Sequence, residues 1–341
     1  MVTNKYLKWL SETDSYWWND SAVLQDMDEA INNGATGVTT NPILVSRSLY
    51  ANDDFWRPYL QSAKGLKKSD KVEEIIRCIT VKIASKFLPI YETTGGQQGY
   101  VCAQVDPTKQ SDTEAMIAMG KRLVQWAPNI ALKLPATKAG LDAIEELASL
   151  GYTTVGTVSF TTPQAVEIAR RQQLGIERAK AAGIHTKAAF SVIMVGRLDD
   201  YLRDVIRDNG IDVNESDIIQ AGTACIKNAY RICRERGYAS QLLPAGMRGA
   251  YHAVALSGAE MTMSLSSGIH TMLCDVTDFS EHIDDVIDKD VLDRLMRADE
   301  FRRAYEPAGM APEDFITYGA TQRTLTQFVE AGWKTIEAFE I

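Results

Sequence analysis

The sequence predicts a (β/α)8 barrel (TIM barrel) that carries an N-terminal helix, a helical insertion and a C-terminal helical extension. The first observation behind this prediction is a repeated pattern, in which a helix-like run ends at a glycine and leads into a short apolar strand. The pattern recurs at Gly34, Gly151, Gly183, Gly237 and Gly258. Glycine just past a helix end adopts the left-handed backbone conformation at little cost, which turns the chain toward the next strand.

The second observation is the number of strands. Eight segments have the short apolar composition of a buried strand, at residues 16–19, 37–40, 100–106, 130–134, 153–160, 186–195, 241–245 and 261–265. Strands that alternate with helices pair in parallel through right-handed crossovers, and eight such units favour a closed barrel over an open sheet. No G-x-G-x-x-G motif follows the first strand and the sequence has no P-loop, so nucleotide binding is not indicated.

Further segments are additions to the barrel. Residues 1–14 are predicted to form a leading helix. Residues 50–98 contain an insertion, in which an apolar stripe from Ile76 to Phe87 predicts a helix that stops at Pro89. No change of composition marks a linker, so we predict a single domain over residues 1–341.

Residues 93–99 are rich in glycine and are predicted to form a flexible loop before the third strand. Residues 277–341 are predicted to be a mostly helical extension packed on the barrel. Its last helix carries an apolar stripe that indicates either core packing or contacts between subunits of a homo-oligomer. The stripe consists of Leu325, Phe328, Val329, Ile336 and Phe339.

Composition narrows the class of protein. The net charge of −9 and the lack of a basic cluster argue against nucleic acid or an anionic membrane as a partner. The apolar runs are too short to span a bilayer, and residues 1–10 do not resemble a signal peptide. The five scattered cysteines form no C-x-x-C pair and indicate a reduced, cytoplasmic protein. The four histidines lack metal-ligand spacing, so no metal site is predicted.

The strand at residues 130–134 holds one lysine at its centre. Alternation places Ile130, Leu132 and Leu134 on one face and Lys133 on the other, toward the interior if the first face packs on helices. A buried ammonium ion must find a partner or lose its proton, and an uncharged lysine forms Schiff bases with carbonyl substrates. The alternative is an exposed edge strand on which Lys133 prevents aggregation.

Other polar residues fall where a barrel carries its catalytic groups, at the C-terminal ends of strands and in the loops that follow. They are Asp20, Thr39, Asn41, Gln104, Asp106, Lys133, Thr157, Ser159, Arg197 and Arg248. An amine can attack a ketone, a carboxylate can move protons, amides and hydroxyls can hold substrate oxygens, and guanidinium groups can hold an anion. This set predicts a Schiff-base lyase or transferase acting on an anionic sugar, with neither a metal nor an organic cofactor.

Each of these residues also has a structural interpretation. Asp20 could cap the following helix, and Arg197 or Arg248 could pair with a carboxylate such as Asp199 or Asp200. His252, close to the same end of the barrel, is interpreted as structural. The placement of so many polar groups at successive strand ends favours catalysis over these alternatives.

Five segments resemble the transaldolase family, which includes the fructose-6-phosphate aldolases. They are residues 37–42 (GVTTNP), residues 132–137 (LKLPAT) with Gly140-Leu141, Gly156-Thr157 with Gln164-Ala165, residues 195–199 (VGRLD) and residues 245–248 (AGMR). They run in the family's order from about Asp20 to about Leu273. No resemblance is claimed for residues 50–98 or beyond residue 277.

The resemblance implies a role for each matching residue. Lys133 would be the nucleophile and Asp20 the acid and base, Asn41 and Thr157 would hold substrate or water, and two arginines would bind phosphate. The predicted catalytic residues are Lys133, Asp20, Gln104 and Thr157. The predicted substrate-binding residues are Asn41, Thr39, Arg197, Arg248, Ser159, Met194 and Gly246.

Three positions depart from the family pattern. Gln104 stands where transaldolases usually have glutamate and the aldolase branch has glutamine. Met194 stands where transaldolases have phenylalanine and the aldolase branch has the tyrosine that positions water. Gly246 replaces the serine expected before Arg248, so the anion need not be a standard phosphate.

We therefore predict a transaldolase-type transferase of carbohydrate metabolism that moves a dihydroxyacetone unit from a ketose phosphate, or a related anionic sugar, to an aldose. The first alternative is a lyase that releases free dihydroxyacetone. The second is a catalytically silent barrel used for binding or assembly.

Overall fold

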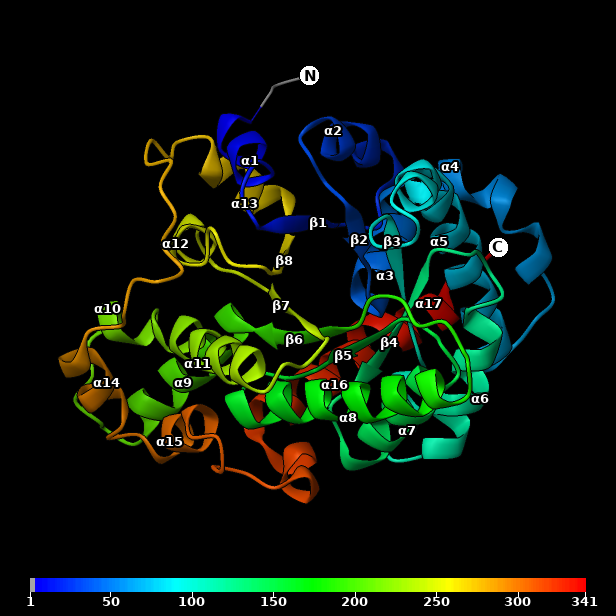
Figure 1. Cartoon of the computed structure of the whole chain (residues 1–341). Helices are drawn as coiled ribbons and strands as arrows, with labels where there is room; N and C mark the ends of the chain where they lie inside the picture. Colours follow the sequence, from blue (N-terminus) through cyan, green and yellow to red (C-terminus); the bar gives the residue numbers. More distant parts are fainter. Residues whose placement is uncertain (1–3) are drawn as a thin grey trace.

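The computed structural model describes residues 4–341, and its centre is a barrel of parallel strands surrounded by helices (Figure 1). The eight-stranded sheet has the order β7-β6-β5-β4-β3-β2-β1-β8. The strands are β1 (Tyr16–Asp20), β2 (Gly37–Thr39), β3 (Tyr100–Gln104), β4 (Ile130–Pro135), β5 (Thr154–Thr157), β6 (Phe190–Met194), β7 (Gln241–Ala245) and β8 (Thr262–Leu265). The predicted fold class and all eight predicted strands are confirmed, with the ends of several strands shifted.

The two ends of the sheet, β7 and β8, lie side by side, but no ladder of backbone hydrogen bonds joins them. The hydroxyl of Thr262 donates to Gln241 Oε1 at 2.9 Å across this junction. The amide of Gln241 donates to Ala189 on the β6 side, so by alternation position 244 faces β8. Because Pro244 has no N–H, it cannot donate a ladder hydrogen bond to β8, which explains why the closure is incomplete.

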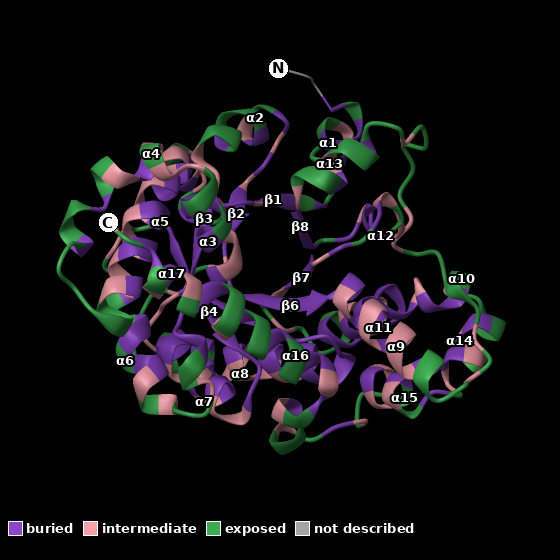
Figure 2. Ribbon diagram, turned by 180° about the vertical axis from the view of Figure 1, so that it is seen from behind, coloured by how far each residue is buried: buried purple, intermediate pink, exposed green. Residues whose placement is uncertain are grey.

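Helices that follow the strands form the outer layer. They are α2 (Met27–Asn32), α3 (Pro42–Ala51), α6 (Thr113–Leu123), α7 (Lys138–Ser149), α8 (Thr162–Ala181), α9 (Val195–Asp208), α11 (Ala221–Glu235), α12 (Ala250–Ala255) and α13 (Ser267–Leu273). Figure 2 shows that the strands are buried and that exposed residues lie on the outer faces of the helices. The apolar core therefore lies inside the barrel and between strands and helices.

The N-terminal helix is shorter than predicted. Helix α1 covers Lys5–Leu10, and Asn4 caps it by accepting a hydrogen bond from the amide of Leu7. It lies beside α13 (Figure 1). The first three residues of the predicted run lie outside the described residues.

The prediction that the inserted helix stops at Pro89 is wrong. Helix α5 spans Lys68–Thr93 with Pro89 inside it. Packing against β3 continues past the proline, where Tyr91 is buried, and this contact outweighs the one hydrogen bond that proline cannot donate. Short helical segments precede α5, namely α4 (Asp53–Trp56), η2 (Arg57–Tyr59) and η3 (Gln61–Ala63).

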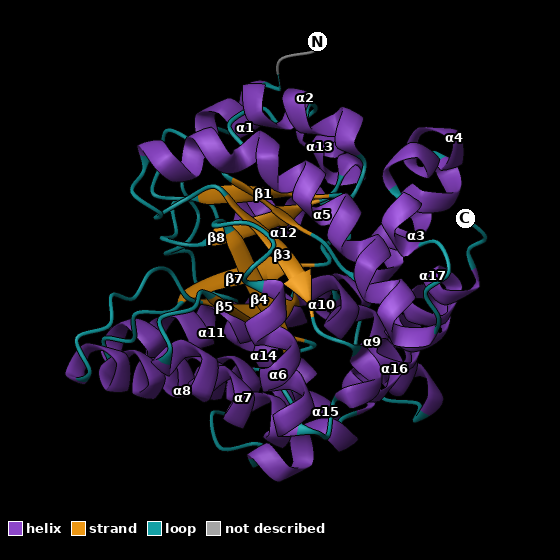
Figure 3. Cartoon of the chain, turned by 90° about the vertical axis from the view of Figure 1, so that its right-hand side faces the viewer, coloured by secondary structure: helices purple, strands orange, loops and turns teal. Residues whose placement is uncertain are grey.

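The C-terminal extension is helical, as predicted, but its last helix is not continuous. The extension consists of α14 (Lys289–Leu295), α15 (Asp299–Tyr305), η5 (Pro312–Thr317), α16 (Gly319–Gln327), the π-helical turn η6 (Phe328–Trp333) and α17 (Lys334–Ala338). Most of its predicted apolar stripe is buried within this chain, so the stripe serves as core. Figure 3 shows α3, α16 and α17 together on one side of the barrel.

The turn η6 packs closely on the start of α3. A Cβ at Gly332 would lie 2.6 Å from Pro42 Cβ and 3.0 Å from the amide nitrogen of Ile43. Glycine at this position therefore permits the close approach. Within residues 4–341, no helix is both long and apolar enough to cross a bilayer.

Candidate active site

A cavity of about 460 Å³ lies at the C-terminal ends of the strands. Its lining includes Asp20, Asn41, Arg47, Lys133, Thr157, Met194, Arg197, Gly246, Arg248, Ser264, Ser266, Gln327 and Ala331. Most residues predicted from strand ends therefore meet in one place. A larger cavity of about 780 Å³ lies beside α11, but none of the predicted site residues lines it.

Lys133 lies in β4, between β3 and β5, and only 5% of its surface is exposed. Its Nζ donates a hydrogen bond to the carbonyl oxygen of Thr40 at 3.1 Å. Among residues 4–341, no carboxylate forms an ion pair with it. The alternative of an exposed edge-strand lysine is thus wrong, because this side chain points into the barrel.

The residues after Lys133 hold the end of β4 in place. Thr137 caps α7, because its hydroxyl oxygen accepts a hydrogen bond from the amide of Gly140 at 3.0 Å. A Cβ on Gly140 would lie 1.9 Å from the carbonyl oxygen of Pro135, so only glycine fits there. The L-K-L-P-A-T…G pattern thus has a geometric basis, which is to start a helix directly against the end of the strand that carries Lys133.

Asp20 ends β1 and accepts a hydrogen bond from the hydroxyl of Thr39, which in turn contacts the hydroxyl of Ser264. The hydroxyl of Thr39 donates to Asp20 Oδ1 at 2.8 Å and also lies 2.6 Å from the hydroxyl of Ser264. Since Thr39 has one proton, Ser264 must donate to Thr39. Asp20 does not cap the next helical segment, which begins at Leu24, so the interpretation of Asp20 as a helix cap is wrong.

Two buried oxygens near Lys133 have no hydrogen-bond partner among the described residues, namely Thr157 Oγ1 and Gln104 Oε1. Gln104 is the direct neighbour of Lys133 in the β3–β4 register. Val158, which follows Thr157, has a φ of 53°, a strained value for a β-branched residue. Such strain is commonly kept at functional sites.

Arg197, in the first turn of α9 after β6, and Arg248, in the turn after β7, both line the cavity. Arg197 Nη1 donates to Gln327 Oε1 at 2.6 Å, which ties it to the C-terminal extension. Burial, and then repulsion from Arg248, lowers the pKa of the Arg197 guanidinium. Arg248 is exposed and pairs with Asp200, as the structural interpretation predicted.

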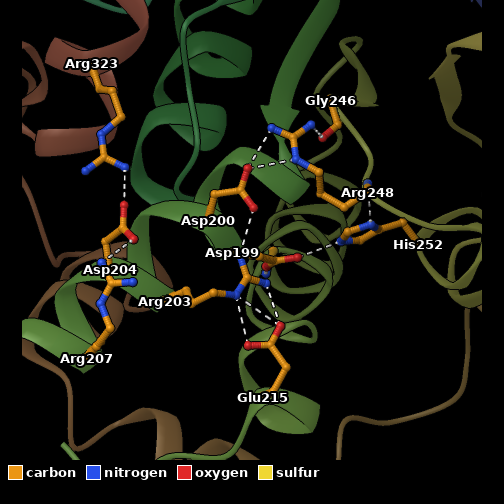
Figure 4. A network of polar contacts seen from close by, with 11 residues as sticks. Asp199, Asp200, Arg203, Asp204, Arg207, Glu215, Gly246, Arg248, His252 and Arg323 are labelled. Carbon is orange, nitrogen blue, oxygen red and sulfur yellow. Dashed lines mark hydrogen bonds and ion pairs between the residues drawn. The ribbon is translucent and has the colours of Figure 1, made fainter. Parts of the chain in front are cut away.

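The turn that carries Arg248 is fixed at both its main chain and its side chain (Figure 4). Asp200 Oδ2 accepts from Arg248 Nε at 2.8 Å. The Arg248 amide donates to His252 Nδ1 at 3.3 Å, and His252 Nε2 lies 2.9 Å from Asp199 Oδ2. His252 and Asp199 are fully buried, and burial raises the pKa of the Asp199 carboxyl. The adjacent residues Asp199 and Asp200 therefore hold opposite ends of Arg248.

A comparison with known families agrees with this site. The family described as Transaldolase/Fructose-6-phosphate aldolase matches residues 17–313. The chain belongs to this family. The match extends further than the motifs in the sequence, since it includes residues 50–98 and part of the C-terminal extension.

Individual members of the family are similar at modest identity. Transaldolase 1 of Streptomyces avermitilis is 35% identical over 208 residues, which is 58% of this chain and 54% of that protein. Transaldolase 1 of Streptomyces coelicolor is 31% identical over 242 residues, covering 68% of this chain and 61% of that protein. A transaldolase of Neisseria meningitidis serogroup C is 30% identical over 192 residues, 53% of this chain and 54% of that protein. The chain spans about half the length of the first of these relatives.

Some residues predicted from their position at strand ends do not line the cavity. The hydroxyl of Ser159 donates to the carbonyl of Val192 and is fully buried, so it faces away from a substrate. Thr39 and Gln104 are not part of the cavity lining, although Thr39 donates to Asp20 and Gln104 is the neighbour of Lys133 in the β3–β4 register. Asn41 does line the cavity, but its Oδ1 caps α3 by accepting from the amides of Ile43 and Leu44, which leaves its amide nitrogen for a ligand.

The structure adds cavity residues that the sequence analysis missed. Arg47 lies on α3, Ser264 in β8, and Gln327 and Ala331 in the C-terminal extension. Ser264 could have been found, because it is a polar residue in the eighth strand of a transaldolase-family barrel. No residue pattern marked the others, since they do not lie at strand ends. Within the described part of the chain, no cluster of His, Cys, Asp or Glu could hold a metal ion.

Proposed function

We propose that this protein is a transaldolase-type transferase, which moves a dihydroxyacetone unit from a ketose phosphate to an aldose acceptor through a Schiff base on Lys133. The observation that carries the proposal is the buried Lys133 amine, which points into a cavity that also holds the Asp20 carboxylate and two arginines. An uncharged lysine amine is the nucleophile that forms Schiff bases with ketones.

In the first step, Lys133 Nζ attacks the carbonyl carbon of the ketose and forms a carbinolamine. Asp20 carries to the departing oxygen the proton that the amine loses, solvent supplies the second proton, water leaves, and an iminium ion remains. The hydrogen bond from Thr39 orients the Asp20 carboxyl for this transfer. The buried oxygens of Thr157 and Gln104 suit the binding of that water or of a substrate hydroxyl.

In the second step, Asp20 accepts the proton of the C4 hydroxyl and the C3–C4 bond breaks. The electron pair of that bond moves into the iminium and forms an enamine, while the aldose leaves. The enamine then attacks the carbonyl of the acceptor aldehyde, and the same steps in reverse release the product ketose. The arginines hold the anionic end of the sugar through charge-assisted hydrogen bonds.

A second candidate is a lyase that releases free dihydroxyacetone, as in fructose-6-phosphate aldolases. Gln104 favours it, because the sequence resemblance places glutamine in that branch. Met194 favours transfer, because a thioether cannot position water as a tyrosine hydroxyl can. Measuring cleavage of fructose 6-phosphate with and without erythrose 4-phosphate separates the two, since strict dependence on the acceptor supports transfer.

Borohydride reduction in the presence of a ketose phosphate tests the shared intermediate. The intact mass should rise by the reduced three-carbon unit, and peptide mapping should place it on Lys133. Lys133→Met should abolish trapping, whereas Lys138→Met, which removes an exposed lysine paired with Asp142, should not. Full trapping in Lys133→Met would overturn the mechanism, and no trapping in the wild type with any ketose would favour a silent barrel.

The remaining functional predictions rest on the sequence. A place in the pentose phosphate pathway follows from the proposed transfer. A cytoplasmic location rests on the cysteine pattern, and all five cysteines are free thiols in the structure. Assembly into a homo-oligomer and the lack of a nucleic-acid partner stay predictions.

A further inference from the structure

We infer that Arg47, together with Arg197, is a principal ligand of the substrate's anionic end, and that this end is a dianion such as a terminal phosphate. The inference rests on the proposed function and adds a residue of α3 to the site. It also changes the role of Arg248, whose charge is already balanced by the protein.

The position of Arg47 on α3 directs it to the cavity. Asn41 fixes the start of this helix, and Ile43, Leu44 and Arg47 all line the cavity. Residues three and four apart share one face of a helix, so this spacing places Arg47 on the face that meets the cavity. Its side chain is exposed there.

The charge on Arg47 is not compensated within residues 4–341. Most arginines in this part of the chain form an ion pair with a carboxylate, but Arg47 forms neither an ion pair nor a hydrogen bond there. Arg197 also lacks a carboxylate partner, because its strong hydrogen bond goes to the neutral Gln327. Arg47 and Arg197 line the same cavity, so a ligand there can reach both guanidinium groups.

Arg248 differs from both. Its Nε and Nη2 bind Asp200 Oδ2, at 2.8 and 2.7 Å, and its Nη1 donates to the carbonyl oxygen of Gly246 at 3.0 Å. Each nitrogen of this guanidinium therefore already has a protein partner. A ligand in the cavity faces two uncompensated cations and one compensated cation, and a dianion matches the uncompensated pair.

Gln327 also suits the binding of an anion in the cavity. Its carboxamide holds Arg197 in place without cancelling the charge, and its amide nitrogen can donate to an anion oxygen. Because Gln327 belongs to the C-terminal extension and Arg47 to α3, the anion site lies between two segments that pack on each other through η6.

The test is Arg47→Met, with Arg236→Met as a matched control. Arg236 is an exposed arginine with no ion pair in the described residues, and it does not line the cavity. One charge-assisted hydrogen-bonding group contributes enough to predict a rise in KM for a ketose phosphate of about 10- to 100-fold in Arg47→Met, with kcat little changed. Inhibition by inorganic phosphate should weaken by a similar factor, while Arg236→Met behaves as the wild type.

Unphosphorylated substrates distinguish this inference from the proposed function. Borohydride trapping of the unphosphorylated ketose on Lys133 should be equal in the wild type and in Arg47→Met. If trapping fails in both proteins with the ketose phosphate as well as with the unphosphorylated ketose, the proposed function is wrong. If trapping succeeds but Arg47→Met leaves the KM for the ketose phosphate and the inhibition by phosphate unchanged, the role of Arg47 is wrong. Separate assays with phosphorylated donor and phosphorylated acceptor show which of them uses this site.

Discussion

Replacing His252 by leucine tests the buried pair beneath Arg248. The change leaves the Asp199 carboxylate fully buried with one remaining hydrogen bond, from the amide of Gly222 at 2.8 Å. Leaving a buried carboxylate without one of its two partners costs about 3–5 kcal/mol. For 341 residues, an unfolding entropy of ~2.1 cal/mol/K per residue gives about 0.7 kcal/mol/K, so Tm should fall by about 4–7 °C at pH 7.5.

The loss should depend on pH. Burial raises the pKa of Asp199 above its unfolded value, while the hydrogen bond and charge of His252 act to lower it. A carboxyl with a raised pKa in the folded state contributes stability below its unfolded pKa, and this contribution is lost as the pH rises through the folded pKa. His252→Leu removes the lowering effect, so the variant should lose more stability at pH 7.5 than at pH 4.5.

A double variant supplies the control. Asp199→Asn in the His252→Leu background keeps the acceptor for the Gly222 amide and removes the charge, so most of the lost Tm should return. The assay is thermal unfolding by circular dichroism at both pH values, with KM for the ketose phosphate measured alongside. An equal loss of Tm at both pH values, or no recovery in the double variant, would refute this account of the pair.

Two further predictions concern the strand ends. Gly140→Ala places a Cβ 1.9 Å from the carbonyl oxygen of Pro135 and should destabilise the fold by about 3 kcal/mol in urea unfolding, whereas Gly268→Ala, with only one atom 3.9 Å away, should change stability little. Equal effects would contradict the steric reason given for the motif. Thr39→Val removes the hydrogen bond to Asp20 and should lower kcat about 10-fold with KM nearly unchanged, and a change confined to KM would argue against that role.

The alternation of the strands explains why several residues of the cavity lining could be predicted from the sequence. Once β4 was placed inside a barrel, period-2 alternation determined that Lys133 faces the interior, and the strand-end rule located Asp20 and Thr157. Both rules depend only on short-range geometry. They placed Ser159 in the site wrongly, because the chain leaves β5 at Thr157 and passes through the strained Val158, after which the alternation no longer applies.

Long-range packing explains what the sequence did not predict. Pro89 would end an isolated helix, but contact with β3 keeps α5 intact beyond it. Gln327 meets Arg197 across 130 positions of the chain, and no local pattern encodes that contact. It depends on η6 packing against α3, which in turn requires glycine at position 332.

The cavity residues lie on two kinds of element, strands and outer helices, and this affects which substrates members of the family can accept. The amine of Lys133 and the carboxylate of Asp20 lie on strands, whose geometry the barrel holds fixed, so the proposed carbon–carbon bond chemistry would be tied to the fold. Arg47 and Gln327 lie on α3 and at the end of α16, so the charge and length of the accepted sugar can change without disturbing the barrel. Exchanging the C-terminal extension or the exposed face of α3 should therefore alter KM for the anionic substrate before it alters the formation of the Schiff base.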